Sequence, residues 1–384
     1  MLPVMKRLFI ISTFLLLFIA ESSAQESGSF IGRMWKKVTS PNKHFETEYI
    51  FQTPLRFQVI PEYKLSDNTV TLNSDLSTGL GDETANASLH LNLKGNPFHS
   101  IGGKVAYGPL SLGASVQFGP HDKQNKSNFI KLYSSAYGIQ YRRTKINQYI
   151  TGSLDLSQIG GADFPDMVSD YPGTVNYTVI DAYYVFNRNR FSYVAAYDGG
   201  KLIQKKSVGS PILVGRYLKG KTTIDPRDEV ILNLLAYTGK YGNTQLSFGA
   251  GYSYNIVFFH RDPSEGYHGL QNLTMSLTAA PMLSIINNII TTRYQYSPGS
   301  SEPEGERHSK VQGQMQPNFV TRAGLFFAKD RFYFNVYSDF AIVHFDSGSR
   351  KMSFDESSIG NDYAITSKGN FSNWFLGINA GFRF

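Results

Sequence analysis

Histidines are the first side chains to examine for catalytic chemistry, because an imidazole can act as a general base. A catalytic site would also need a nucleophile and an orienting group close to that base. The eight histidines are scattered along the chain, in no pattern typical of a phospholipase, an acyltransferase or a protease: His44, His90, His99, His121, His260, His268, His308 and His344. We therefore expect the protein not to be an enzyme.

Acidic side chains alternate at one place, where Glu302, Glu304 and Glu306 precede His308. Their oxygen atoms could hold a divalent cation. A solvated loop is the simpler interpretation, because the same stretch contains Ser, Pro and Gly. We expect no metal and no other cofactor.

The basic run Lys205-Lys206-Ser207 is a candidate anion contact. Its ammonium and hydroxyl groups could bind the phosphates of lipopolysaccharide or an anionic solute. Two other interpretations stay open, namely a charge network inside a lumen and a plain solvated turn.

The elements that would position these residues have a period of two. In the last stretch of the chain one set of alternate positions is apolar: Trp374, Leu376, Ile378, Ala380, Phe382 and Phe384. The other set is small or polar except for one aromatic residue: Asn373, Phe375, Gly377, Asn379, Gly381 and Arg383. This pattern predicts a strand with one dry and one wet face, and residues 245–258 repeat it.

Composition indicates where such strands belong. Charged residues make up only 17% of the chain, the mean hydropathy is −0.25, and Gly (35), Tyr (24) and Phe (28) are abundant. Alternation hides membrane strands from hydropathy averages, because each lipid-facing residue is followed by a lumen-facing one. We predict an all-β fold, a closed transmembrane antiparallel β-barrel of about 12 strands, with 10 to 14 possible and an even number expected. Within it, 129–141 and 146–156 are predicted to form a hairpin over Arg142–Lys145.

The N-terminal residues predict export. Lys6 and Arg7 precede an apolar run at 8–20, which is shorter than the roughly 20 residues of a membrane-spanning helix. Small residues follow, so we place the signal peptide at 1–24, with cleavage between Ala24 and Gln25. A periplasmic lead-in at 25–53 without a strand period and a barrel at 54–384 would follow, and the expected location is the outer membrane.

Absences in the composition exclude other classes. The chain has no cysteine, so it can carry neither a disulfide nor a lipid-modified cysteine. The net charge of +7 does not point to nucleic acid, because Lys and Arg are scattered and form no stripe. The expected partners are outer-membrane lipids, including lipopolysaccharide.

A motif in the middle of the chain is more specific. Residues 183–197 read as two aromatic strands around a turn of Asn and Arg, with four side chains suited to lipid: Phe191, Tyr193, Ala195 and Tyr197. Together with 203–210, this stretch resembles an uncharacterised family of Bacteroidetes outer-membrane barrels, whose members show Y-x-F-N-x-x-K-F-S-Y-R-A-A-F and then R-Q-K-K-S-A-G-S. This chain departs from that pattern at five positions: Arg190, Val194, Tyr197, Ile203 and Val208. The resemblance implies a barrel and brings no activity.

The end of the chain carries a second resemblance. A closing aromatic residue is similar to the terminal strand of outer-membrane barrels, where it forms part of the signal read by the barrel-assembly machinery. That resemblance implies an assembly signal at Trp374, Phe382 and Phe384.

The expected function is a non-enzymatic narrow pore or a structural envelope barrel. Six polar residues at alternate positions of predicted strands are candidates for its lumen: Arg56, Gln58, Asn255, Arg322, Asn335 and Asp339. A barrel that binds a lipid or partner protein is the alternative, and a barrel enzyme acting on envelope lipids is the second alternative.

Overall fold

The structure is a computed structural model in which the described residues belong to one compact unit, Phe45–Phe384. Among the described residues, no helix is long and apolar enough to cross a membrane. The proposed signal peptide with Ala24 and Gln25, and the residues Arg56 and Phe384, lie outside the described part. The described residues are 45–53, 57–80, 83–94, 97–107, 110–117, 125–134, 136–148, 151–155, 167–168, 173–197, 202–229, 232, 238–296, 303–352 and 363–383.

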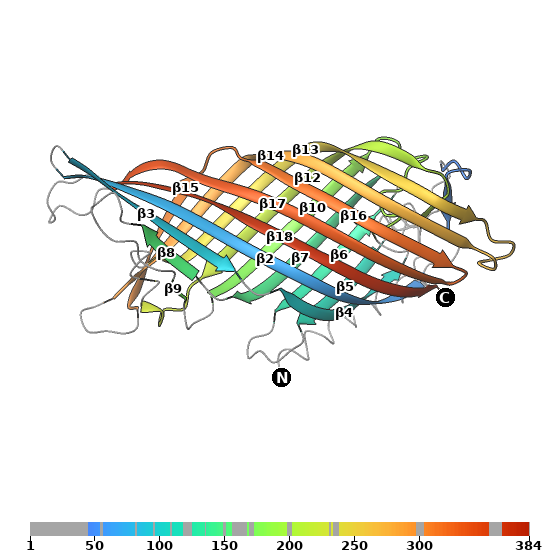
Figure 1. The fold of residues 1–384 in the computed structure, drawn as a ribbon, viewed down its shortest axis with the longest axis horizontal. Coiled ribbons are helices and arrows are strands. Elements are labelled where there is room, and N and C mark those ends of the chain that lie inside the picture. The colour runs from blue at the N-terminus through green and yellow to red at the C-terminus, as the bar shows by residue number, and fades with distance from the viewer. Residues whose placement is uncertain are drawn as a thin grey trace, which may run out of the picture. The chain divides into compact units, whose positions relative to one another are not determined.

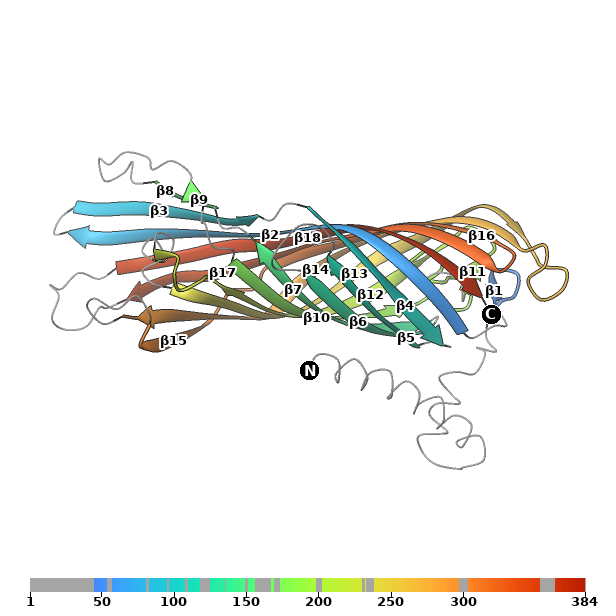
Figure 2. The same cartoon turned by 90° about the horizontal axis from the view of Figure 1, so that it is seen from below.

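One antiparallel sheet closes on itself as a 12-strand barrel (Figures 1 and 2). Its segments are β2 (Phe57–Leu80), β3 (Glu83–Lys94), β4 (Phe98–Tyr107), β5 (Leu110–Gln117), β6 (Lys126–Tyr133), β7 (Tyr137–Gln148), β8 (Thr151–Asp155), β9 (Met167–Val168), β10 (Gly173–Val185), β12 (Val208–Thr223), β13 (Thr238–Arg261), β14 (Gln271–Gln295), β15 (Gly305–Gln312), β16 (Pro317–Lys329), β17 (Phe332–Met352) and β18 (Tyr363–Arg383). This confirms the predicted fold class.

The strand count depends on which segments share a position in the barrel. β3 and β4 both pair with β2, and β15 and β16 both pair with β14, so each pair is one interrupted strand. β18 pairs with β2 from Tyr363 opposite Thr78 to Arg383 opposite Gln58, which closes the barrel. We call the rim where β2 begins and β18 ends the base.

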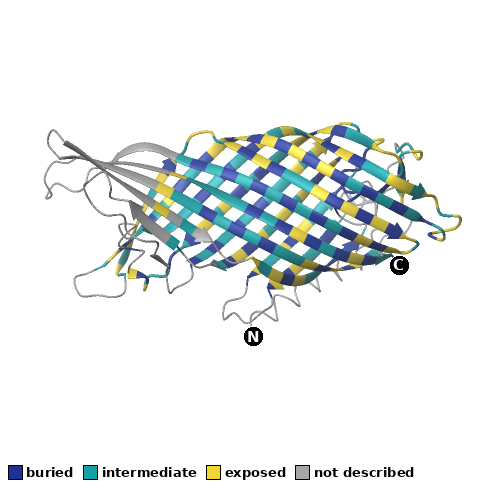
Figure 3. Cartoon of the chain, viewed as in Figure 1, coloured by how far each residue is buried: buried dark blue, intermediate teal, exposed yellow. Residues whose placement is uncertain are grey.

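Burial alternates along the strands as the sequence pattern predicts, and it gives the checkerboard of Figure 3. On β18, Asn373 and Arg383 are buried while Leu376 is exposed. Elsewhere Ile101 and Phe258 each expose 57% of their surface. A polar interior and an apolar exterior reverse the arrangement of a water-soluble protein and are typical of a membrane barrel.

The predicted hairpin at 129–156 is wrong. β6 ends at Tyr133 and β7 begins at Tyr137, and the Ser134 hydroxyl donates to the Tyr137 carbonyl and accepts from the Tyr137 N–H. Arg142–Lys145 lie within β7 and pair with β10. The run of charged residues predicted a turn. In a barrel with a polar lumen, however, charged residues can also lie in the middle of a strand.

Candidate functional site

The lumen near the base is occupied by the chain itself. β10 and β12 pair directly, with Val185 opposite Ile212, so the residues between them are not a strand of the barrel. We call residues 186–197 and 202–204 the inner segment. Phe191, Tyr193, Ala195 and Tyr197 of this segment are at most 7% exposed, so the prediction that they face lipid is wrong.

Local turns explain why the alternating pattern does not make a strand here. The backbone N–H groups of Arg190 and Phe191 both donate to the carbonyl of Asn187. Further turns join Ala195 to Ser192 and Tyr197 to Val194. These bonds satisfy backbone groups without a neighbouring strand, so the segment can fold inside the barrel.

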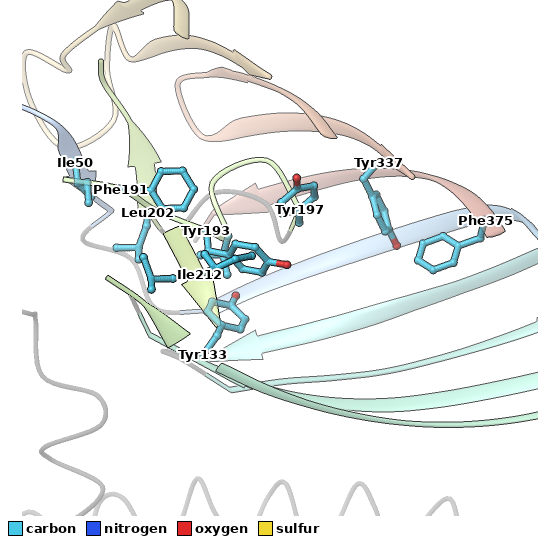
Figure 4. Close-up of a cluster of buried hydrophobic side chains, with 11 residues drawn as sticks. Ile50, Tyr133, Phe191, Tyr193, Tyr197, Leu202, Ile212, Tyr337 and Phe375 are labelled. Atoms are coloured by element: carbon cyan, nitrogen blue, oxygen red, sulfur yellow. The ribbon is translucent and has the colours of Figure 1, made fainter. Parts of the chain in front are cut away.

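Aromatic side chains of the inner segment and the barrel wall meet in the lumen. Tyr193 and Tyr197 point into it with Tyr337 of β17 and Phe375 of β18 (Figure 4). The ring centroids of Tyr193 and Tyr197 are 5.7 Å apart. The family-like motif therefore forms an internal packing surface.

A short strand before the barrel docks onto the inner segment. β1 (Ile50–Gln52) pairs with β11 (Leu202–Gln204) in a separate two-stranded sheet. Ile50 and Ile203 are buried there. The predicted lead-in at 25–53 thus contains a strand that sequence reasoning missed, because three residues are too few to show a period.

Gln204 is the polar centre of this arrangement and is fully buried. Its amide nitrogen donates to the carbonyls of Tyr49 (3.0 Å) and Arg190 (2.7 Å). Its amide oxygen accepts from the backbone N–H of Ser192 (2.9 Å) and from Asn255 (3.0 Å). One side chain therefore joins the residue before β1, the inner segment and the barrel wall.

The candidate lumen residues lie inside the barrel where they are described, and two of them hold the inner segment. Asn255 donates to the carbonyl of Ser192 (2.8 Å), and Asn335 donates to the carbonyl of Ala196. Gln58 accepts from Tyr333 at 3.1 Å. Each of these side chains therefore makes at least one hydrogen bond within the protein.

The other two candidates, Arg322 and Asp339, belong to a buried charge cluster. The Arg322 Nε lies 3.0 Å from an Asp339 oxygen, and its terminal nitrogen lies 3.8 Å from Asp181. Arg216 binds Asp181 at 2.6 Å. The cluster is neutral overall, with two cations and two carboxylates. Sequence reasoning missed Asp181 and Arg216, although both stand at inward positions of alternating strands.

Ion pairs at the base fasten the inner segment. Arg190 binds Glu46 at 2.7 Å, and Lys206 binds Glu48. The hydrogen bond and charge of Lys206 lower the pKa of the Glu48 carboxyl, and Glu48 raises the pKa of Lys206 in turn. We call these two pairs the base latch.

The candidate anion contacts lie beside this latch. Lys205 binds Asp262 at 2.8 Å, so an external anion would have to displace a carboxylate from either lysine. Burial would raise the pKa of Asp262, but hydrogen bonds from Lys205 and His260 hold it below its ordinary value. The Ser207 hydroxyl accepts from the backbone N–H of Val257.

One arrangement near the far rim partly resembles a catalytic triad. The Thr292 hydroxyl lies 3.0 Å from the His308 Nδ1, and the His308 Nε2 lies 4.0 Å from Glu306. That last distance is too long for a hydrogen bond, and Glu306 is bound by Lys240. In the described part of the chain, no group of three or more His, Cys, Asp or Glu side chains could hold a metal ion.

Comparison with known families identifies the family of this chain. The family model described as a domain of unknown function, DUF4421, matches residues 60–384. The chain belongs to this family. The resemblance to an uncharacterised domain family is thereby confirmed at that level. No curated protein matches the chain.

Several solved barrels are similar to this DUF4421 chain at low identity. The outer membrane protease OmpT of Escherichia coli is 10% identical with a TM-score of 0.38, over 85% of this chain and 97% of that one. The translocator domain of the autotransporter NalP of Neisseria meningitidis is 12% identical with a TM-score of 0.32, over 94% and 97%. The toluene transporter TodX of Pseudomonas putida is 7% identical with a TM-score of 0.22, over 86% and 91%.

Proposed function

We propose that the protein is a non-enzymatic outer-membrane barrel with a narrow, gated lumen, held closed at its base by the inner segment. The apolar exterior supports a membrane location, and the predicted export signal supports the outer membrane. Outer-membrane lipids and, during biogenesis, the barrel-assembly machinery are its proposed partners. Twelve strands lie between the filled eight-stranded barrels and the open 16- to 18-stranded porins, which fits a narrow passage.

The observation that carries this proposal is how the inner segment is held. It is not part of the barrel sheet, because β10 and β12 pair without it. It is fixed by side-chain hydrogen bonds from Asn255 and Asn335 and by the small sheet of β1 and β11. A segment held in this way can leave the lumen without breaking the barrel.

The test is conductance in planar lipid bilayers. Because Phe186 N–H donates to the carbonyl of Pro211, residues 187–210, which include the inner segment and the first three residues of β12, can be replaced by Asn-Gly, a two-residue hairpin turn. The wild type should conduct little, and this variant should form channels. A correctly inserted variant that stays silent would identify a structural barrel instead.

A milder variant controls for misfolding. A Cβ atom at Gly324 would lie 2.6 Å from the Ala196 carbonyl oxygen, so Gly324→Val should push the inner segment away and raise conductance. A Cβ atom at Gly220 meets nothing within 4 Å, so Gly220→Val is the matched control and should behave as wild type. Large stable channels in the wild type would contradict the closed state.

The rival functions have separate readouts. Hydrolysis of labelled envelope lipids, abolished by His308→Ala, would establish the enzyme. Co-purification of one lipid or protein in stoichiometric amount, with no conductance in any variant, would establish a binding barrel.

A further inference from the structure

We propose that the lumen beside the inner segment contains a binding site for a small organic carboxylate, with Arg142 as its principal contact. This inference deepens the proposed function and rests on it for the role of the ligand, although binding itself can be measured without conductance.

The site is a cavity between the inner segment and the barrel wall. It offers about 60 Å³ to the centres of water-sized molecules, which is room for a few waters or a small ligand group. Tyr193 and Tyr197 of the inner segment line one side, and Phe129 and Phe375 of the barrel line another. The lining therefore offers aromatic surface for the apolar part of a ligand.

Cations outnumber carboxylates around this cavity. Its lining holds four cations, Lys64, Lys131, Arg142 and Arg322, and two carboxylates, Asp181 and Asp339. Three further charged groups interact with this lining. Glu62 binds Lys64, the charge of Lys104 acts on Glu62, and Arg216 binds Asp181. Among the described residues, these groups sum to six cations against three carboxylates, an excess of three positive charges around the cavity. Such an excess is unfavourable unless an anion balances it.

The cations gather around two phenyl rings. The Lys64 ammonium lies 5.2 Å from the Phe129 centroid and 5.6 Å from the Phe375 centroid. The Lys131 ammonium also lies 5.2 Å from Phe129, and the Arg142 guanidinium carbon lies 5.7 Å from Phe375. A guanidinium that stacks over a ring keeps its N–H donors in its own plane. These donors point outward from the edge of the guanidinium and can still bind a ligand.

Arg142 differs from Arg216 and Arg322 in its partners. Arg216 and Arg322 bind carboxylates of the charge cluster. The Arg142 Nε is buried and has no hydrogen-bond partner among the described residues. A buried unsatisfied donor of this kind is unfavourable, and a planar carboxylate would satisfy two donors of one guanidinium at once.

A neighbouring cavity extends the positive lining away from the inner segment. It shares Lys64, Arg142 and Phe375 with the first cavity and adds Lys126. The rest of its lining is Ser, Thr, Asn, Tyr and Phe, with no carboxylate. An anion in this second cavity would therefore meet only cations, neutral polar groups and aromatic rings.

These features select one class of ligand. The positive excess excludes organic cations, and the donors of Arg142 favour a planar oxyanion. The rings of Phe129, Tyr193 and Phe375 favour an apolar or aromatic body over a small inorganic ion. Benzoate has both parts and is a suitable probe.

Calorimetry on the full chain in detergent tests the site with four probes. Benzoate should bind, inorganic phosphate should bind more weakly, and benzyl alcohol and benzylamine should not bind measurably. Equal binding of benzoate and benzyl alcohol, or no binding of benzoate, would overturn the proposal. Phosphate binding as tight as benzoate would overturn the organic ligand class.

A pair of arginine variants locates the contact. Arg142→Gln should weaken benzoate binding about ten- to a hundredfold, the effect of losing one charge-assisted contact. Arg143→Gln is the matched control, because it makes the same charge change at the next, exposed residue of β7 and should leave the affinity unchanged. Equal losses in both variants would reduce the effect to net charge and refute the site.

Selectivity separates this proposal from the gated pore. In a KCl gradient, the channel of the Gly324→Val variant should have a reversal potential on the anion-selective side, and Arg142→Gln should move it toward zero. A cation-selective channel would overturn the lumenal anion site while leaving the pore intact. Benzoate binding without any channel would overturn the gated pore while leaving the lumenal anion site intact.

Discussion

Replacing Gln204 by Leu should release the inner segment while leaving the barrel folded. Leucine nearly fills the same volume but can neither donate to the Tyr49 and Arg190 carbonyls nor accept from Ser192 and Asn255. Four partner groups lose a hydrogen bond in a place where Gln204 itself is fully buried. The closed arrangement should therefore lose free energy relative to an open one.

The magnitude follows from these four contacts. A buried polar group left unsatisfied costs about 1–3 kcal/mol. The Asn255 amide keeps its bond to the Ser192 carbonyl, and water can reach some partners once the segment loosens. We therefore expect a total of about 3–5 kcal/mol rather than the full sum. At about 1.4 kcal/mol per factor of ten, the open population should rise roughly a hundred- to several thousandfold.

The absence of cysteine makes labelling a clean assay. Ala195, only 1% exposed, can be changed to cysteine and labelled with a water-soluble maleimide. The labelling rate should rise about a hundredfold or more when Gln204→Leu is added. Gln312→Leu, the same change at an exposed position of β15, should leave the rate unchanged.

Gel mobility separates local from global effects. The Gln204→Leu variant should still run faster unheated than boiled, as a folded barrel does. A labelling rate equal to that of the parent would refute the role of Gln204 as the polar centre. Loss of the fast-running form would show that barrel and inner segment unfold together.

Three further predictions concern the latch, the charge cluster and the last residue. Because the pKa of Glu48 is lowered, its pair with Lys206 stabilises the closed form above the ordinary Glu value of about 4.3 and is lost as pH falls through the lowered value. Divided by the rate of an exposed cysteine such as Gln312→Cys, which corrects for the loss of thiolate at low pH, the labelling rate should thus be flat from pH 7 to 5 and rise at lower pH. Asp339→Asn should destabilise the refolded barrel in urea by about 3–5 kcal/mol, and adding Arg322→Met should restore part of that loss. Deleting Phe384 should reduce insertion in cells more than it lowers stability in detergent, and equal effects would leave Phe384 as ordinary lipid-facing surface.

The barrel could be predicted because its signal is repeated in every strand. Alternation on β18 separates Leu376, Ile378 and Ala380 from Asn379 and Arg383, and the structure divides these residues between the same two faces. A shift by one residue would place Arg383 in lipid, so the register is strongly constrained. No such constraint acts on a segment that leaves the sheet.

The inner segment could not be predicted because its alternating sequence is compatible with two structures, a lipid-facing strand and a segment buried in the lumen. Phe191, Tyr193 and Tyr197 alternate with Ser192 and Ala196, as in a lipid-facing strand. Inside the lumen both sets are buried, and the Ala196 carbonyl lies close to the backbone of β16 at Gly324. The distinguishing feature is the direct pairing of β10 with β12, in which Val185 lies opposite Ile212 and no barrel strand is left for residues 186–197 to pair with.

The lumenal asparagines show a similar limit of sequence reasoning. Asn255 and Asn335 were predictable as inward-facing, because each stands among apolar neighbours at alternate positions. An inward amide has the same sequence signature whether it meets water, a solute or a backbone carbonyl. Here each donates to a carbonyl of the inner segment, from Ser192 and Ala196 respectively. The polar lumen of this barrel therefore serves first to hold its own chain, and beside that segment the described cation Arg142 keeps a buried donor without a hydrogen-bond partner.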